Sequence, residues 1–339
     1  MNEKFYVTDC EGPLSINDNA YEIADYFIPS GGEFFSILSN YDDILAQKYP
    51  DTHFAGSTLK YILPFFKAYD LTENDLVEFS QDNINMIDGA YYMIKYVQSV
   101  MPFYIVSTSY NQYIKALSDK TGFKYENTYS TILNMDDYEL SADEADKLLA
   151  IRENILFDSS FENIDRLFSR VIGNMKINSL IESVKPVGGI GKYEAILDII
   201  EKNDYKAENL IYSGDSITDK EALAYARDNG GVSISFNGNI HSIKAASISI
   251  ASQNNLILAV MADVFRNKST SGVYDFVHEY NENPLEALLD YSIDENITKE
   301  LLLNKASIDI IDDENMEQLN NKVKITRNKI RGKSIGNLG

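Results

Sequence analysis

An α/β fold built on a doubly wound parallel sheet is the class that this sequence of 339 residues predicts. Five short runs are rich in β-branched and aromatic residues and lack polar alternation, which is typical of strands buried on both faces. Each run ends in small or acidic residues, and helical patterns separate several of them. Strands that alternate with helices indicate a parallel sheet. The expected strands are residues 5–9, 103–109, 209–215, 231–238 and 247–252.

Helical spacing is clearest in residues 192–203, where Ala195, Ile196 and Ile199 fall on one face. Such a stripe predicts an amphipathic helix that packs on the sheet. The apolar stretch that begins near residue 254 predicts a last helix of the same kind.

Two long interruptions of the strand–helix rhythm predict caps. Residues 15–87 look helical throughout, and a smaller helical insertion covers about 128–184. Both are too long for simple connections, so they are expected to lie over the sheet as lids or caps. The predicted α/β core is then residues 1–14 and 88–265, followed by a C-terminal extension, 266–339.

Details within these segments carry further expectations. The aromatic pairs at 34–35 and 65–66 are expected to form the core of the cap rather than a ligand site. Residues 72–75 read Thr-Glu-Asn-Asp, which fits a helix capping box. The extension ends in a basic tail, 322–333, which is expected to be a frayed, solvent-exposed end. Docking onto a protein partner through this C-terminal region is the alternative.

Composition limits the classes of function. The net charge of −22 argues against nucleic acid and anionic lipid as partners. An anionic substrate would therefore need local cations or a metal. No apolar stretch approaches the roughly 20 residues of a membrane span, and no signal peptide is expected at the N-terminus. The single cysteine, Cys10, excludes an internal disulfide framework and favours a reducing cytoplasm. Three scattered histidines argue against a histidine-built zinc site.

Polar side chains gather at the expected carboxyl ends of strands, the edge where ligands bind in open parallel sheets. Taken singly, each is an ordinary turn, capping or solvent-exposed residue. Taken together and in this order, each after its own strand or at the start of a helix, they indicate one site. The clusters are Asp9 with Glu11, Ser107 with Thr108, Lys192, and Asp215 with Asp219.

These residue types suit phosphoryl transfer. A carboxylate can attack phosphorus and form an aspartyl-phosphate that water then hydrolyses. Attack on an anionic phosphate requires charge neutralisation, which Mg²⁺ held by carboxylates provides. Hydroxyl, backbone N–H and lysine donors can hold the transferring group. A second acid can protonate the leaving alkoxide and later deprotonate the attacking water.

The segments "DCEGPL", "VSTSY", "GIGKYEAI" and "GDSITDKEAL" resemble motifs I to IV of the haloacid dehalogenase (HAD) superfamily, most of whose members are Mg²⁺-dependent phosphatases. The spacing is similar to the phosphoserine phosphatase branch. The pattern is closest to an archaeal group named energy-converting hydrogenase A subunit R. The resemblance covers about residues 5–14, 88–125 and 185–262. It implies a HAD-like doubly wound sheet with a helical cap inserted after motif I and a smaller helical insertion after motif II.

The resemblance also implies roles. Asp9 would be the nucleophile and a metal ligand, and Glu11 would take the acid/base position and offer its backbone carbonyl to Mg²⁺. Ser107 and Thr108 would bind the phosphate with Lys192, which would also neutralise the nucleophile. Asp215 would bind Mg²⁺ directly, and Asp219 directly or through water.

Two residues depart from the family pattern, which usually has Asp at position 11 and Thr at position 13. Glu11 adds a methylene that shifts proton-transfer geometry, and Pro13 stiffens the exit toward the cap. The first hypothesis is a cytoplasmic Mg²⁺-dependent phosphatase acting on a small phosphorylated metabolite. The alternative is a weakly active or non-catalytic regulatory subunit of a hydrogenase-related complex, because a fold alone does not determine function.

Overall fold

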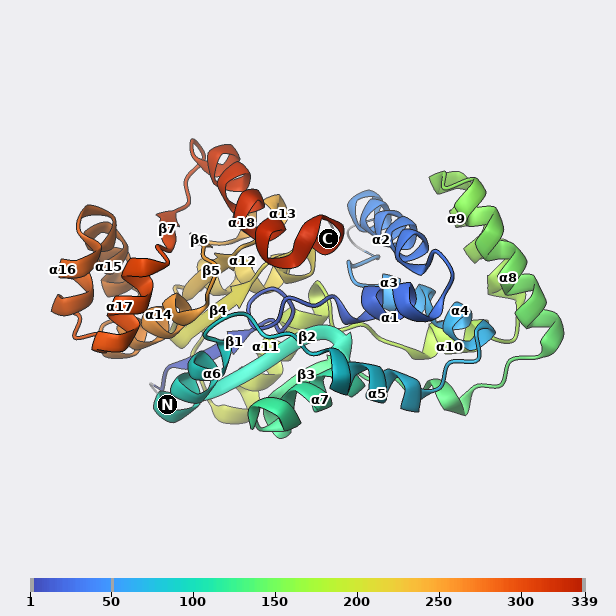
Figure 1. Cartoon of the computed structure of the whole chain (residues 1–339), viewed down its shortest axis with the longest axis horizontal. Helices are drawn as coiled ribbons and strands as arrows, with labels where there is room; N and C mark the ends of the chain where they lie inside the picture. The colour runs from blue at the N-terminus through green and yellow to red at the C-terminus, as the bar shows by residue number, and fades with distance from the viewer. Residues whose placement is uncertain (1–2, 50–51, 337–339) are drawn as a thin grey trace.

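The computed structural model describes residues 3–49 and 52–336 and contains a seven-stranded sheet (Figure 1). The strand order is β3-β2-β1-β4-β5-β6-β7, and every neighbouring pair is parallel except β6 with β7. The prediction of an α/β fold with a mostly parallel sheet is therefore confirmed. The strands are β1 Phe5–Thr8, β2 Phe103–Tyr110, β3 Thr128–Thr131, β4 Leu210–Gly214, β5 Val232–Phe236, β6 Ile248–Ala251 and β7 Ser307–Ile310.

Helices cover both faces of this sheet, as a doubly wound topology requires. Alternate side chains of β1 point to opposite faces: Tyr6 joins one apolar cluster, and Phe5 and Val7 join another. The first cluster includes residues of α6, Ala90–Val100, α7, Asn111–Thr121, and α14, Leu256–Asn267. The second includes residues of α11, Ile190–Asn203, and α12, Lys220–Asp228. The strands are buried on both faces for this reason, which explains their continuous apolar runs.

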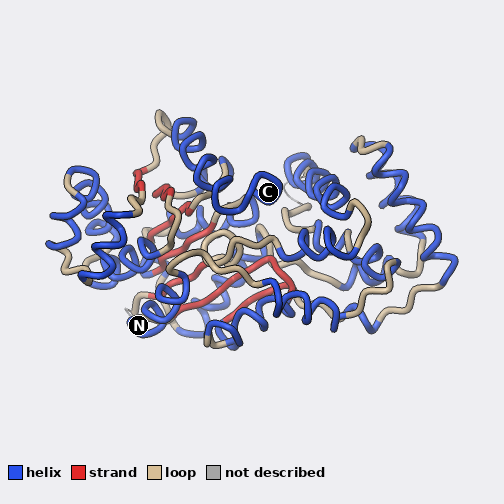
Figure 2. The backbone as a smooth tube through the Cα atoms, viewed as in Figure 1, coloured by secondary structure: helices blue, strands red, loops and turns tan. Residues whose placement is uncertain are grey.

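The helices of the two insertions lie together beyond one end of the sheet (Figures 1 and 2). They share one apolar cluster, which includes Phe34 and Leu76 from the first insertion and Leu148 and Leu180 from the second. We call this two-part body the cap. The first insertion forms α1 Asn19–Phe27, α2 Gly31–Lys48, α3 Thr58–Tyr61, α4 Leu63–Ala68 and α5 Glu73–Asn83. The second forms α8 Ala142–Phe157, α9 Phe161–Arg166 and α10 Asn178–Ser183.

Two expectations about the cap are confirmed. Phe34, Phe65 and Phe66 are wholly buried in its apolar cluster, and Phe35 is nearly so. Thr72 begins α5 with a complete capping box, in which its side chain accepts from the backbone N–H of Asp75.

Three helices after α14 extend the core: α15 Thr270–Glu282, α16 Pro284–Asp290 and α17 Glu295–Leu303. The chain then adds β7 to the edge of the sheet, antiparallel to β6. The last helix, α18 Met316–Gly336, interrupted at Gly332, runs back toward the middle of the molecule, between the core and the cap (Figure 1).

The prediction of a frayed, solvent-exposed basic tail is wrong for α18. Leu319 and Val323 are buried in an apolar cluster with residues of α13, Ile240–Ala245, and β6. Arg327 lies one helical turn after Val323 on the same face of α18, and it is 3% exposed. The basic composition of the segment concealed a helix face that is anchored on the core.

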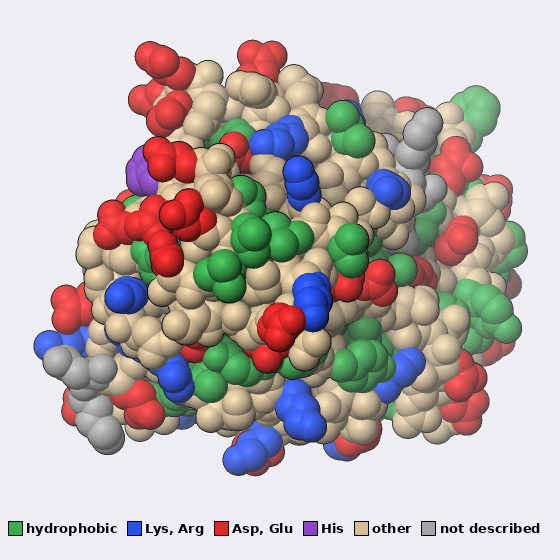
Figure 3. All heavy atoms as spheres, turned by 60° about the vertical axis from the view of Figure 1, so that its left-hand side comes forward, with side chains coloured by type: hydrophobic (Ala, Val, Ile, Leu, Met, Phe, Trp, Pro, Cys, Tyr) green, Lys and Arg blue, Asp and Glu red, His purple; other side chains and the backbone are tan. Residues whose placement is uncertain are grey.

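Acidic side chains gather in groups on the face shown in Figure 3, and basic side chains lie singly between them, in keeping with the net charge of −22. None of the helices formed by the described residues is both long enough and apolar enough to cross a membrane.

Candidate active site

The loop after β1 passes directly over the carboxylate of Asp215. Gly12, in this loop, has a φ of +106°, and a Cβ built on it would lie 2.3 Å from the carboxyl carbon of Asp215. Only glycine combines this backbone conformation with so close an approach. The glycine of the "DCEGPL" motif thus brings the end of β1 against the end of β4.

Lys192 joins two of the predicted carboxylates. Its Nζ lies 2.6 Å from Oδ2 of Asp9 and 2.7 Å from Oδ1 of Asp219. The lysine comes from the first turn of α11 and is wholly buried. A buried ammonium is stable only when opposite charges and hydrogen bonds replace its water, and the two carboxylates do so here.

The carboxylate of Asp219 accepts hydrogen bonds from strand β4 and from the loop that follows it. Besides Lys192, the hydroxyl of Tyr212 donates to Oδ1 at 2.7 Å. The backbone N–H groups of Asp215 and Ser216 donate to Oδ2 at 2.9 and 3.0 Å. With both oxygens engaged by protein donors, Asp219 orients Lys192 and the loop that carries Asp215.

The protonation equilibria follow from this arrangement. Burial raises the pKa of Asp9 to about 7, although Lys192 opposes the rise. For Asp219 burial also acts upward, but Lys192 and the hydrogen bonds outweigh it and hold the pKa below its usual value. Burial alone would lower the pKa of Lys192, yet Asp219 and Asp9 raise it, so the lysine stays charged.

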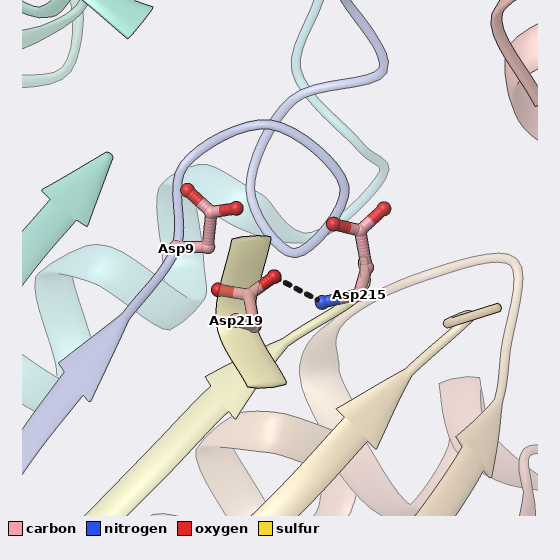
Figure 4. A group of neighbouring side chains, drawn as sticks. All are labelled: Asp9, Asp215 and Asp219. Atoms are coloured by element: carbon pink, nitrogen blue, oxygen red, sulfur yellow. Dashed lines mark hydrogen bonds between the residues drawn. The ribbon is translucent and has the colours of Figure 1, made fainter. Parts of the chain in front are cut away.

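The donor set fits a hard divalent cation. Asp9, Asp215 and Asp219 each offer a carboxylate oxygen, and these three oxygens lie within 4.8 Å of one another (Figure 4). Mg²⁺ prefers such oxygen ligands and usually keeps several waters. Because the oxygens of Asp219 already accept five hydrogen bonds, Asp9 and Asp215 are the better direct ligands, with Asp219 behind them.

The carboxylates open into a cavity of about 110 Å³ between the core and the cap. Ser107, Thr108 and Glu11 line it together with Asp9 and Asp215, so the structure brings the predicted site residues to one place, with Lys192 buried beneath Asp9. The Oγ of Ser107 accepts from the backbone N–H of Ser109 at 3.2 Å. The buried Oγ1 of Thr108 has no hydrogen-bond partner among the described residues. The cap side of the cavity includes Phe35, Asp42, Asp43, Thr58 and Leu59.

A loop of the cap closes tightly on the core at this cavity. Asp42 holds the loop by accepting from the backbone N–H groups of Gly56 and Thr58 at 2.9 and 3.0 Å. A Cβ on Gly56, whose φ is +103°, would lie 2.9 Å from the methyl group of Thr108. Glycine therefore permits the close contact between the cap and the strand end that carries Ser107 and Thr108.

Glu11 reaches across to the cap. Its Oε1 accepts a hydrogen bond of 2.7 Å from the backbone N–H of Asn19, the first residue of α1. The carboxyl group of Glu11 therefore binds the N-terminus of a cap helix as well as lining the cavity. Burial, followed by the charge of Asp18, raises the pKa of Glu11 well above its usual range.

Sequence reasoning missed two residues of the site, Arg327 and Arg331 of α18. Both guanidinium groups donate to Oδ2 of Asp215, and that of Arg331 does so at 3.0 Å. A signal was present in the sequence: Leu319, Val323, Arg327 and Arg331 recur every four residues and form one ridge of a helix. The net basic composition of the tail hid this pattern.

No protein-family model matches the chain, and no curated protein matches it. Among solved structures, gene product AF1437 from Archaeoglobus fulgidus is 26% identical over 100% of this chain and 99% of its own, with a TM-score of 0.82. A phosphoserine phosphatase, solved as a phospho-aspartyl intermediate analogue, is 15% identical over 74% of this chain and 93% of its own, with a TM-score of 0.48. A HAD-family hydrolase from Salmonella enterica serovar Typhi is 12% identical over 68% of this chain and 61% of its own, with a TM-score of 0.39.

The structural neighbours therefore include HAD-superfamily members. AF1437 has the same fold over its whole length.

Proposed function

We propose that this protein is a Mg²⁺-dependent phosphohydrolase of the HAD type, which cleaves a small phosphorylated metabolite through an aspartyl-phosphate on Asp9. One observation carries the proposal: a wholly buried lysine bridges Asp9 and Asp219 beside Asp215, and Asp9 and Asp215 line a cavity between the core and the cap. A structural ion pair does not require a third carboxylate at the same point, whereas phosphoryl transfer uses all of these groups.

In the proposed reaction a carboxylate oxygen of Asp9 attacks phosphorus, and the bond from phosphorus to the leaving oxygen breaks. Ser107, Thr108 and Lys192 hold the phosphoryl oxygens. Mg²⁺ at Asp9 and Asp215 would favour the ionised form of Asp9 and offset the charge of the phosphate.

Glu11 is the proposed acid and base. Burial raises the pKa of Glu11 well above its usual range, which favours the protonated carboxyl group that a donor to the leaving alkoxide requires. The resulting carboxylate then takes a proton from the water that attacks the phosphorus of the aspartyl-phosphate. Phosphate leaves, and Asp9 and protonated Glu11 are restored.

The cap defines the substrate class. The cavity of about 110 Å³ admits a small phosphoester, and it contains both apolar and acidic cap residues, such as Phe35, Leu59 and Asp43. A small metabolite with a neutral or cationic leaving group fits this lining better than a polyanion.

The test is a screen of small phosphoesters with and without Mg²⁺. We expect turnover that Asp9→Asn abolishes and Glu11→Gln lowers at least 100-fold, whereas Asp119→Asn, an exposed surface control, keeps the wild-type rate. Absence of turnover on every phosphoester, or equal turnover by Asp9→Asn, contradicts the proposal. Such a result would favour a non-catalytic subunit, and co-purification of a partner that is lost on deleting the residues after 270 would support that alternative.

A further inference from the structure

The last helix delivers two cations to the proposed metal ligand. Arg327 and Arg331 come from α18, more than 110 residues after Asp215, and both donate to its Oδ2. The side chains of Arg327 and Arg331 are only 4% and 7% exposed, and both residues line the cavity of the site. A chance surface contact would leave such long side chains largely in water, so the burial indicates that they belong to the site.

The docking of α18 uses a single ridge. Leu319 and Val323 pack into the apolar cluster on α13 and β6, and the same ridge continues with Arg327 and Arg331. The apolar half anchors the helix on the core, and the basic half extends from it over the carboxyl edge of the sheet.

Arg327 connects the carboxylate of Asp215 to two backbone carbonyl groups of the core. Besides Oδ2 of Asp215, its Nη1 contacts the backbone carbonyl of Asn237 at 3.1 Å and that of Asp215 at 3.4 Å. These two carbonyls follow β4 and β5, so the guanidinium spans neighbouring strand ends.

Arg331 connects the same carboxylate to the cap. Its Nε donates to the carbonyl of Ile16 at 3.0 Å, and its Nη2 donates to the carbonyl of Asn17. Ile16 and Asn17 lie in the linker that leaves the core for α1.

This outgoing linker pairs with the linker that returns from the cap. The backbone N–H of Ile16 donates to the carbonyl of Asn85, and that of Asn85 donates to Oδ1 of Asn17, at 2.9 and 2.8 Å. We call the paired linkers the cap hinge. Arg331 therefore binds the outgoing linker of the cap hinge and Asp215 at the same time.

We propose that α18 is an integral part of the active site, in which Arg327 and Arg331 position the carboxylate of Asp215 for Mg²⁺ and tie it to the cap hinge. Both cations meet one carboxylate oxygen, so the rotation of the carboxylate is restricted while its second oxygen can serve as a ligand. Hydrogen-bonded partners of a ligating carboxylate typically change metal affinity by about 10–100-fold. The proposal rests on the proposed function for the identity of the metal.

Mg²⁺ binding, measured by titration calorimetry without substrate, tests the positioning role independently of turnover. We expect Arg331→Lys and Arg331→Gln each to weaken Mg²⁺ binding about 10–100-fold, because lysine keeps the charge but loses the planar fork. Lys324→Gln, an exposed change on the same helix, should bind Mg²⁺ like the wild type. Arg327→Lys provides a second variant if an Arg331 variant does not fold.

The proposal is refuted if the main effect of the arginines on Mg²⁺ is electrostatic repulsion. If the arginines only repel Mg²⁺, Arg331→Gln will bind it more tightly and Arg331→Lys will bind it like the wild type. Unchanged affinity in both variants also overturns the positioning role while leaving the proposed function intact. Failure of the wild-type protein to bind Mg²⁺ overturns both proposals.

Hydrogen exchange tests the second half of the inference. In Arg331→Lys the backbone N–H groups of Ile16 and Asn85 should exchange faster than in the wild type, whereas the strands of the core should be unchanged. Equal protection of the cap hinge in the two proteins would show that Arg331 does not hold it.

Discussion

Replacement of Lys192 by methionine removes the one positive charge between Asp9 and Asp219. Methionine is close to lysine in length, so the change leaves two carboxylates facing each other in a buried site without creating a large cavity. Breaking a buried ion pair by removing one partner costs about 3–5 kcal/mol. We expect Lys192→Met to lower the free energy of unfolding by about that amount at pH 8.

The loss should depend on pH, with a sign that follows from Asp9. Burial already raises the pKa of this carboxyl to about 7, and removal of Lys192 raises it further. Because the folded state then binds a proton more tightly than the unfolded state, its stability is retained at low pH and lost as the pH rises through the folded-state pKa. At pH 5 Asp9 is protonated in both folded proteins, so the loss should be smaller than at pH 8 by up to about 1.4 kcal/mol, the equivalent of the one pH unit between about 7 and 8.

Urea unfolding at pH 5 and pH 8, followed by circular dichroism, measures both free energies. The matched control is Lys202→Met, which removes an exposed lysine paired with Asp198 and should leave stability near that of the wild type. If Lys192→Met is as stable as this control at pH 8, or loses the same free energy at both pH values, the buried ion network does not hold the site together.

Three further changes have defined outcomes. Glu11→Asp shortens the side chain that accepts a hydrogen bond from the backbone N–H of Asn19, so the free energy of unfolding in urea titrations should fall by about 1 kcal/mol. An unchanged free energy of unfolding would show that this hydrogen bond does not contribute to stability. Gly12→Ala places a Cβ against Asp215 at a positive φ and should lower stability by at least about 2 kcal/mol, measured by thermal unfolding; an unchanged Tm would contradict the close approach. Burial raises the pKa of Asp43 to about 7, so its contribution to stability is lost as the pH rises from about 4 to 7. Asp43→Asn should therefore gain roughly 4 kcal/mol over the wild type at pH 8 relative to pH 4, and an equal difference at both pH values would refute this.

The strands and the placement of the acidic residues could be predicted because they depend on local pattern. A strand buried on both faces has a continuous apolar run, and the parallel topology brings the residue after each run to one edge of the sheet. Asp9 and Asp215 therefore follow β1 and β4 as expected. The two edge strands were not predicted. Residues 128–131 were expected to begin the second helical insertion but form β3, a short strand in which three of four residues are Thr or Ser. In β7 polar and apolar residues alternate inside an acidic stretch.

The partners of these residues could not be predicted, because they depend on distant segments. The hydrogen bond from Asn19 to Glu11 requires knowledge of where α1 begins relative to the loop after β1. The contacts of Arg331 require the position of a helix that follows the whole core, and no local pattern specifies which carboxylate it will meet. The ridge that begins with Leu319 predicts that one face of the helix is buried, but it does not predict which part of the core that face contacts.

The charges of the site bear on how an acidic protein could hold a phosphate. Three carboxylates, Asp9, Asp215 and Asp219, face three cations, Lys192, Arg327 and Arg331, and burial raises the pKa of Glu11, which favours its neutral form. Asp18 adds one negative charge, which the N-terminus of α1 offsets in part, because Asp18 caps that helix. Without α18 the same carboxylates would face Lys192 alone, and one Mg²⁺ would only neutralise them. With α18 in place, a bound Mg²⁺ leaves the site with an excess of positive charge that a phosphate dianion can balance, even though the chain as a whole carries a charge of −22.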